Sequence, residues 1–262
     1  MNYLVSGCQS GLGKFLCHEL MATGISRTTD LGALASEVNA PYDAIIHCAF
    51  NSKINIAASD LAQYMRDNIL LTQQLLTIPH QKFIFISTVD VYPPNVTPFA
   101  EDEDFFIDDI KNIYGLSKLM SETLVQSSTP DYLILRATAM LGLDARKNSL
   151  MKMIFDATPT LSLAPTSRFH YILHEDVLAF IRVALAKDLQ GKFNLASSQP
   201  VILSEVSHFL QKKIEFGSFH YEVGEVNNTK VQHYCQVFQN TSLDNIRRFI
   251  NLLRPHYDRQ VS

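Results

Sequence analysis

Short, nearly continuous apolar runs recur along the first half of this chain, and they limit its fold more than any other feature. Apolar runs of this length without polar alternation are typical of parallel strands that are buried on both faces of a sheet. The four clearest runs are residues 3–5, 44–48, 83–86 and 132–135. A sheet of such strands needs helices on both faces, so the runs predict an α/β architecture.

Segments with a helical spacing of apolar residues separate these strands. The stripes are Leu12, Phe15, Leu16 and Leu20; Leu61, Met65, Ile69, Leu75 and Leu76; and Ile113, Leu116, Leu119, Met120 and Leu124. Alternating strands and helices imply right-handed crossovers and therefore a Rossmann-like doubly wound parallel sheet. Between the first two strong strands, a weak strand at 25–28 and a helix at 31–38 fit, which is short for two full crossover units.

The alternation loosens after about Leu141. Helices are predicted at 149–157, 176–187, 204–212 and 242–253, a strand at 192–196, and loops at 92–103, 158–167 and 225–230. We therefore expect an NAD(P)-binding Rossmann-like domain over residues 1–140. Residues 141–262 are expected to form a small C-terminal substrate lobe that is interleaved with this core.

Charge and cysteine content argue against several classes of function. The net charge of −4 leaves no basic footprint for nucleic acid or for an acidic membrane. The four cysteines form no CxxC pair, so we predict neither a disulfide framework nor a metal site. No apolar run reaches membrane-spanning length, and the first residues lack the pattern of a signal peptide. We expect a cytoplasmic protein without a membrane or nucleic-acid partner.

A glycine-rich turn joins the first strand directly to the first helix. Gly7, Gly11 and Gly13 follow a GxxxGxG spacing. Glycines allow a tight turn and a close approach to a pyrophosphate, which the N–H groups at the helix start would bind. A plain strand-to-helix turn is the alternative, but the position after the first strand favours a dinucleotide loop that includes Ser10 and Leu12.

Two further features suggest acid–base chemistry. Tyr114 and Lys118 are four residues apart, so on a helix they share a face, and the ammonium would lower the pKa of the phenol. Ser87 and Thr88 follow a buried strand, at the sheet edge where α/β proteins bind ligands. Each feature alone is weak, because an idle surface Tyr or an ordinary strand end would give the same pattern.

Together these motifs resemble the extended short-chain dehydrogenase/reductase family, in its NAD-dependent epimerase/dehydratase branch, which modifies nucleotide sugars. That family has a glycine loop, a Ser/Thr-x-x-Val-Tyr segment and Tyr-Gly-x-Ser-Lys in this order, as at 7–13, 88–92 and 114–118 here. Weaker matches continue nearly to the C-terminus, at residues 43–49, Asn68, 135–136, 141–142, Asn148, 171–177 and 191–195.

The resemblance implies roles for particular residues. Tyr114 would exchange the proton of the sugar hydroxyl, Lys118 would lower the pKa of Tyr114 and hold the nicotinamide ribose, and Thr88 would orient the sugar oxygen. Cys48 and Ala49 would lie beneath the nicotinamide ribose, and Ser87 would also border the cofactor. Asn148 would contact the substrate, a nucleotide-activated sugar.

This sequence departs from the family pattern in three places. Its GxxxGxG spacing is that of the non-extended branch, and the chain is shorter than typical members. The shortened second-strand region shows no acidic residue for the adenosine ribose, while Arg27 lies where it could pair with a 2′-phosphate. The cofactor is therefore NADP or NAD, with a lean to NADP, although an exposed Arg27 without a role is an alternative.

The residues after Thr88 bear on the reaction. The family's dehydratases have Thr-Asp-Glu at the positions that match 88–90 here, and this chain has Val89 in place of the Asp that would act as the acid. Asp90 is then either a second proton-transfer residue or a simple loop cap. We expect a reductase or an epimerase rather than a dehydratase. The alternative from another class is a non-catalytic NADP sensor, but such relatives typically lose the Tyr–Lys pair.

The resemblance also implies an assembly. Helices expected at 57–76 and 111–127 carry apolar residues beyond a single stripe, such as Leu70 and Leu71. In the family, the corresponding two helices build a four-helix dimer interface. We therefore expect a homodimer with a two-fold interface.

Overall fold

A six-stranded parallel sheet forms the centre of the protein. The computed structural model describes residues 1–37, 40–93, 98–110, 112–145, 147–222 and 225–258. The strands are β1 (Tyr3–Ser6), β2 (Thr23–Ile25), β3 (Tyr42–His47), β4 (His80–Thr88), β5 (Tyr132–Ala137) and β9 (Gly191–Leu195), in the order β2-β1-β3-β4-β5-β9. This arrangement confirms the predicted Rossmann-like sheet. The order reverses between β1 and β3, so their carboxyl ends form the topological switch point where such sheets bind ligands.

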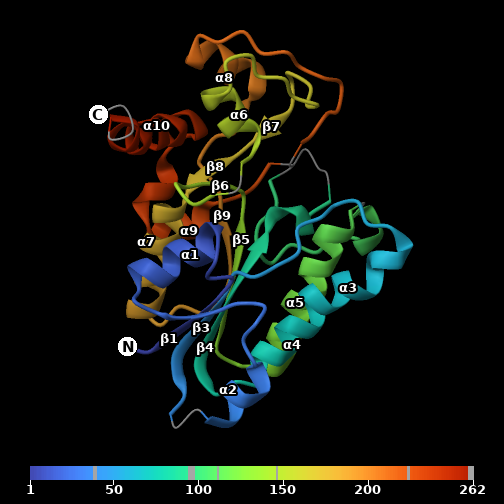
Figure 1. Cartoon of the computed structure of the whole chain (residues 1–262), viewed down its shortest axis with the longest axis vertical. Helices are drawn as coiled ribbons and strands as arrows, with labels where there is room; N and C mark the ends of the chain where they lie inside the picture. The colour runs from blue at the N-terminus through green and yellow to red at the C-terminus, as the bar shows by residue number, and fades with distance from the viewer. Residues whose placement is uncertain (38–39, 94–97, 111, 146, 223–224, 259–262) are drawn as a thin grey trace.

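Helices cover both faces of this sheet (Figure 1). One face carries α1 (Gly11–Glu19), α7 (His174–Ala186) and α9 (Thr229–Tyr234); the other carries α2 (Leu31–Glu37), α3 (Leu61–Met65), α4 (Leu71–Leu76) and α5 (Ile113–Ser128). Neighbouring strand residues enter opposite cores: Val5 packs in the cluster that contains Leu16, and Leu4 in the cluster that contains Leu75. Because both faces are buried, the strands read as continuous apolar runs.

The shortened region after α1 forms a single crossover unit. β2 begins two residues earlier than predicted and ends in a turn, where the Thr29 hydroxyl accepts the Ser26 N–H at 3.1 Å. From α2 the chain passes directly to β3 on the other side of β1, so β2 is the edge of the sheet. Val38, the last residue of the helix predicted at 31–38, and Lys111, the first residue of the helix predicted at 111–127, lie outside the described residues.

The helix predicted at 57–76 is divided into several short elements. It consists of η1 (Ala58–Asp60), α3, the π-helical turn η2 (Arg66–Leu70) and α4. Within η2, the buried Asn68 accepts the N–H of Asn51 at 2.7 Å and donates to the carbonyl of Asn51 at 3.1 Å. Turns of this kind are frequent at functional sites. Here Asn68 fixes the loop that leaves the carboxyl end of β3.

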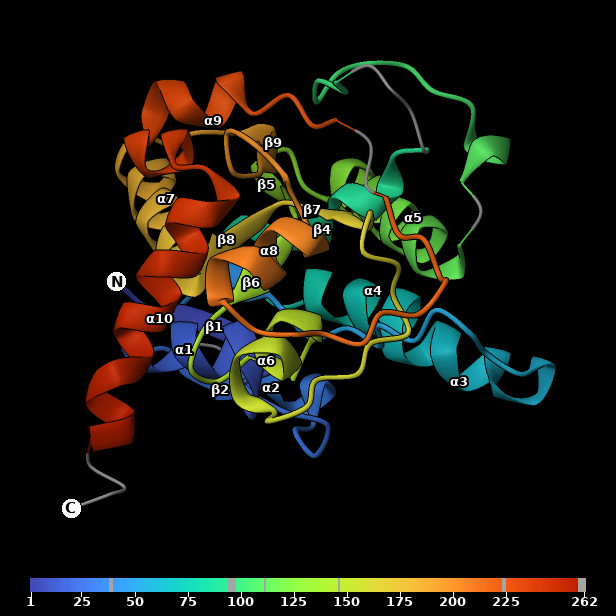
Figure 2. The same ribbon diagram turned by 90° about the horizontal axis from the view of Figure 1, so that it is seen from above.

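A smaller lobe lies over the carboxyl ends of the strands (Figure 2). It contains two-stranded pairs and helices of its own: β6 (Ala139–Leu141) with β8 (Tyr171–Leu173), β7 (Arg168–Phe169) with β10 (Val201–Ile202), α6 (Ser149–Phe155), α8 (Leu203–Leu210) and α10 (Ser242–Asp258). A separate core around Leu150, Met153 and Phe249 holds it together. The predicted helices α6, α7, α8 and α10 are present, whereas α9 and these short strands were not predicted. The second half of the chain also supplies β9 and α7 to the main sheet and its core.

Short 3-10 turns complete the described chain: η3 (Val89–Val91), η4 (Ile107–Asp109) and η5 (Gln236–Gln239). None of the helices in the described ranges is long and apolar enough to cross a membrane.

Candidate active site

The loop between β1 and α1 needs each of its three glycines for a separate reason. Gly7 and Gly11 have φ of +77° and +59°, in the left-handed region that side chains other than glycine rarely adopt. A Cβ on Gly13 would collide with the carbonyl of Gly7, so only glycine lets α1 start this close to β1. A Cβ on Gly11 would meet nothing within 4 Å. The loop is therefore open on the side of Gly11.

A cleft of about 290 Å³ runs from this loop to α5. The structure brings most of the predicted cofactor residues to its walls, from four separate segments: Gly7, Ser10, Gly11, Leu12, Gly13, Cys48, Ala49, Ser87, Tyr114 and Lys118. Further lining residues were not predicted: Phe50, Ser52, Ile86, Met140, Ala145 and His174. Phe50 and Ile86 adjoin predicted residues, which is a signal that could have found them. Met140, Ala145 and His174 come from the second half of the chain, where no spacing links them to the loop.

Two observations test whether this cleft fits a dinucleotide. His174 Nδ1 is buried, has no hydrogen-bond partner among the described residues, and lies against Gly142, where a Cβ would collide with it. Burial lowers the pKa of His174 to about 4, and the imidazole is neutral. The N–H of Gly11, in contrast, donates to the carbonyl of Asp144 at 2.9 Å. The fit to a dinucleotide rests on the glycine loop, where the side of Gly11 is open and the turn at Asp144 covers one of the N–H groups at the start of α1.

Lys118 lies in a dry environment at the end of the cleft. Its ammonium is buried, donates to the carbonyl of Ile86 at 2.6 Å, and sits 3.7 Å from the centre of the Phe50 ring. Burial lowers the pKa of Lys118 to about 7, although the neighbouring Cys48 and Glu122 act in the opposite direction. One helical turn earlier, Tyr114 packs edge-on against the same Phe50 ring. Phe50 thus touches both members of the predicted pair.

A second cavity, of about 210 Å³, adjoins the first one on the side of the lobe. Its polar lining comes from Ser87 and Thr88 at the end of β4, Asp90 after it, Tyr114 on α5, and Thr138, His170 and Tyr221 from the second half of the chain. Tyr114, Ser87 and Met140 line both cavities. The half-buried Tyr114 therefore stands at the boundary between the dinucleotide cleft and this second cavity.

Thr88, Asp90 and Tyr221 form a connected group in the second cavity. The hydroxyls of Thr88 and Tyr221 donate to the two carboxylate oxygens of Asp90, each at 3.0 Å. Burial raises the pKa of Asp90, and these two hydrogen bonds act against that effect. A Cβ on Gly115 would collide with the carbonyl of Asp90, so only glycine lets α5 begin this close to η3. The glycine after Tyr114 thus sets the position of Tyr114 relative to Asp90.

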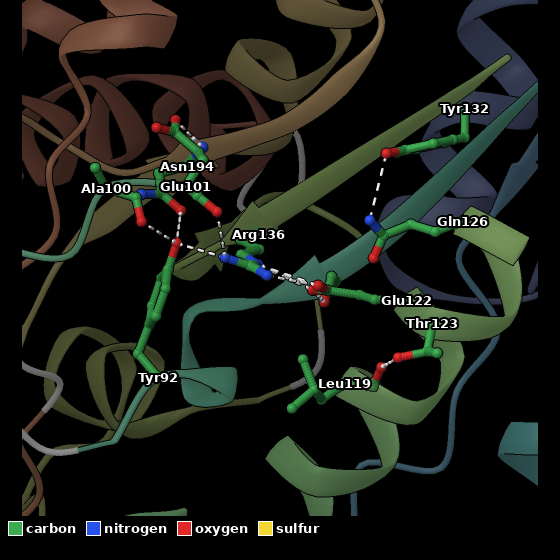
Figure 3. A network of polar contacts seen from close by, with 11 residues as sticks. Tyr92, Ala100, Glu101, Leu119, Glu122, Thr123, Gln126, Tyr132, Arg136 and Asn194 are labelled. Atoms are coloured by element: carbon green, nitrogen blue, oxygen red, sulfur yellow. Dashed lines mark hydrogen bonds and ion pairs between the residues drawn. The ribbon is translucent and has the colours of Figure 1, made fainter. Parts of the chain in front are cut away.

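A buried polar network lies behind these residues (Figure 3). Arg136 on β5 pairs with Glu122 on α5, with the closest contact at 2.7 Å. Arg136 also donates to the hydroxyl of Tyr92, which in turn donates to Asn194 on β9. Ser87 donates to Glu122 at 2.5 Å. The network joins α5 to β4, β5 and β9, and so ties the helix of Tyr114 and Lys118 to the strand end that carries Thr88.

Two predicted residues lie outside the two central cavities. Arg27 is exposed and lines a third cavity, of about 480 Å³, together with Lys53 and Gln63. This cavity shares Phe50 and Ser52 with the dinucleotide cleft. The side chain of Asn148 accepts the N–H of Met151 at 3.0 Å and so caps α6. Asn148 lines a further cavity, of about 260 Å³, in the lobe.

Comparisons with known proteins agree with this architecture. A sequence model of the NAD dependent epimerase/dehydratase family matches residues 3–196. No curated protein matches the sequence. Several solved structures share the fold at sequence identities of 15% to 20%.

One similar structure is the UDP-glucuronic acid 4-epimerase from Bacillus cereus in complex with UDP-glucuronic acid and NAD (20% identity, 97% of this chain and 100% of that chain, TM-score 0.76). Another is DesIV, a dTDP-glucose 4,6-dehydratase from Streptomyces venezuelae with NAD bound (15%, 97% and 97%, 0.81). A third is RMD from Pseudomonas aeruginosa complexed with NADPH (19%, 95% and 98%, 0.73).

The family model covers most of the 262 residues, including the glycine loop, the strand end at Thr88 and the Tyr114–Lys118 pair. The chain therefore belongs to the NAD dependent epimerase/dehydratase family, as its motifs predict.

Proposed function

We propose that the protein is an oxidoreductase or epimerase that transfers hydride between a nicotinamide cofactor and a nucleotide-activated sugar. The observation that carries this proposal is the place of Tyr114, which lines both the dinucleotide cleft and the second cavity. An acid–base group for alcohol–carbonyl interconversion must reach the sugar oxygen while the sugar carbon faces the cofactor. A residue at the boundary of the two cavities meets this requirement.

Each member of the centre has a distinct role in this proposal. The bound nicotinamide supplies the site that accepts or donates the hydride. Tyr114 takes or returns the hydroxyl proton, and Thr88 hydrogen-bonds the same sugar oxygen. Burial lowers the pKa of Lys118 to about 7. When the phenol of Tyr114 ionises, its negative charge stabilises the ammonium of Lys118, and the ammonium stabilises the phenolate in return. Cys48, Ala49 and Ser87 border the cofactor.

The second cavity favours reduction or epimerisation over dehydration. Val89 is buried and apolar, at the position where the family's dehydratases have an acidic residue. Asp90 is the carboxylate that remains for a second proton transfer. The rival function is a non-catalytic NADP sensor on the same fold. The retained Tyr114, Lys118 and Thr88, all in the walls of the two cavities, support the enzyme.

Three finer proposals accompany this function. The cofactor is NADP rather than NAD, because Arg27 and Lys53 line the cavity next to the dinucleotide cleft, although Asp60 and Asp67 line it as well. Asn148, which lines a cavity together with Lys147 and Lys152, contacts the substrate. The protein is a homodimer through the helices around Leu61, Leu70 and Met120, whose side chains are between 44% and 47% exposed in one chain.

Replacing one phenol oxygen tests the proposed enzyme. Tyr114→Phe keeps the ring that packs on Phe50 and removes only the acidic hydroxyl. Loss of a positioned general acid–base group lowers turnover by about 10²–10⁴, while dinucleotide affinity should stay within about twofold. The assay follows nicotinamide absorbance with UDP- and dTDP-hexoses. Tyr132→Phe is the matched control, because its hydroxyl accepts only a peripheral contact from Gln126. Near-normal turnover by Tyr114→Phe would overturn the proposal and revive the sensor.

A further inference from the structure

The second cavity contains a carboxylate, and none of the residues that line it carries a positive charge. Its polar groups are Asp90, the hydroxyls of Ser87, Thr88, Tyr114, Thr138 and Tyr221, and the imidazole of His170. Burial lowers the pKa of His170 to about 4, and its Nδ1 lies 3.0 Å from the Ser197 carbonyl. At neutral pH the imidazole is therefore uncharged. Asp90 is the one ionic group in the lining of this cavity.

The carboxylate of Asp90 is held in place from both sides. Thr88 donates from the sheet and Tyr221 donates from the lobe, each at 3.0 Å. Tyr221 is itself fixed, because its ring stacks on Phe169 at 4.7 Å and its backbone N–H donates to the hydroxyl of Ser167 at 3.1 Å. Two O–H donors suit an ionised carboxylate, which can only accept.

The nearest cations are already paired with other groups. Arg168, next to Phe169, forms an ion pair with Glu225 at 3.2 Å and lies 3.9 Å from Glu222. Arg136 is paired with Glu122 behind β4. Lys118 donates to the carbonyl of Ile86 and belongs to the lining of the dinucleotide cleft. A second negative charge in the cavity would therefore meet Asp90 with no cation among the residues that line it.

We infer that this cavity selects a sugar ring without a negative charge, and that Tyr221 is the positioning residue that holds Asp90 in place to recognise the ring's hydroxyls and to exclude hexuronic acids. This inference rests on the proposed function, since it concerns the sugar half of the substrate. The physical basis is the electrostatic cost of bringing like charges together in a partly desolvated site, which suppresses wrong partners. Ionised carboxylate oxygens, in contrast, are strong acceptors for sugar hydroxyls.

A binding experiment with matched sugars tests the selection. UDP-glucose and UDP-glucuronic acid differ by one carboxylate, as do dTDP-glucose and dTDP-glucuronic acid. By calorimetry on the cofactor-loaded protein, the neutral member of a pair should bind about tenfold more tightly or better. Asp90→Asn keeps the shape of the side chain and should reduce that ratio to about threefold or less. Equal affinities in the parent protein, or an unchanged ratio in Asp90→Asn, would overturn the inference and leave hydride transfer standing.

Tyr221→Phe tests the positioning role separately. The variant keeps the stack on Phe169 and the charge of Asp90, so the preference for the neutral sugar should remain, while KM for that sugar rises about tenfold. Because the Tyr221 hydrogen bond lowers the pKa of Asp90, its loss should shift the acidic limb of the kcat/KM profile to higher pH. Tyr234→Phe, whose ring packs on Phe193, is the control. Unchanged KM and pH profile would refute the role of Tyr221. If the protein binds the dinucleotide but none of the nucleotide sugars, that result would overturn the proposed function, and this inference with it.

Discussion

The buried pair of Glu122 and Arg136 offers a sharp test of how α5, the helix of Tyr114 and Lys118, is held. The side chains are 1% and 2% exposed, and three N–H···O contacts of 2.7, 3.1 and 3.2 Å join them (Figure 3). Glu122→Gln preserves the size of the side chain and one acceptor, but it leaves the charge of Arg136 buried and uncompensated. Arginine cannot relieve this by losing its proton.

The expected loss of stability follows from that burial. Removing one partner of a buried ion pair costs about 3–5 kcal/mol. Because Gln keeps an acceptor oxygen, we expect the lower end, about 3 kcal/mol. For a protein of this size each kcal/mol shifts Tm by about 2–4 °C, so Tm should fall by roughly 6–12 °C in thermal unfolding followed by circular dichroism. Turnover should fall as well, since Ser87 loses its carboxylate partner next to Thr88.

An exposed ion pair provides the matched control. Lys147 and Asp156 lie 2.9 Å apart, but their side chains are 60% and 36% exposed. Asp156→Asn should therefore cost less than about 1 kcal/mol. The double variant Glu122→Gln with Arg136→Met removes the stranded charge and should be more stable than the sum of the two single losses. Similar Tm changes for Glu122→Gln and Asp156→Asn, or fully additive losses in the double variant, would refute the reasoning.

Four further predictions follow from the cleft and its surroundings. Gly11→Ala should leave the protein folded, with about 1 kcal/mol of backbone strain from its φ of +59°, and weaken dinucleotide binding at least tenfold; unchanged affinity by fluorescence titration would contradict the loop's role. Arg27→Ala should lower the affinity for NADP and leave that for NAD unchanged, whereas tighter NAD binding by the parent protein would rule out the NADP preference. Leu70→Glu should convert a homodimer to monomers in light scattering, and a monomeric parent protein at micromolar concentration would count against the dimer. Lys118→Met should raise Tm, and most strongly below pH 7, because burial lowers the pKa of Lys118 from 10.5 in the unfolded chain to about 7 in the folded protein. The charged, buried lysine destabilises the folded protein by roughly 5 kcal/mol at most, and this cost fades as pH rises toward 10.5. An increase of the Tm difference with pH would contradict the prediction.

The main strands of the parallel sheet and the residues that line the cleft at the glycine loop and α5 could be predicted from the sequence, because both depend on local geometry. A strand buried on both faces must be apolar at every position, so β1, β3, β4 and β5 stand out in the sequence. Residues four apart on a helix share a face whatever surrounds them, which links Tyr114 to Lys118. Strand ends in a doubly wound sheet all open on one edge, so the glycine loop and Thr88 were expected near each other.

Elements whose stability comes from distant partners could not be predicted. β6, β7, β8 and β10 have only two or three residues each, too few for a period, and they form because the lobe packs around its own core. In the π-helical turn, the side chain of Asn68 forms hydrogen bonds with the backbone of Asn51. The spacing of apolar residues does not predict that contact.

The sequence alone therefore determined the Rossmann-like fold, the family, the glycine loop and the spacing of Tyr114 and Lys118, since each is a pattern within a short stretch of chain. Only the tertiary structure decided what surrounds them. It set Phe50 against Lys118, brought His174 from the second half of the chain to the wall of the cleft, and brought Tyr221 to Asp90 across 131 positions of sequence. Such contacts depend on how the lobe folds back over the sheet, and no local spacing encodes that path.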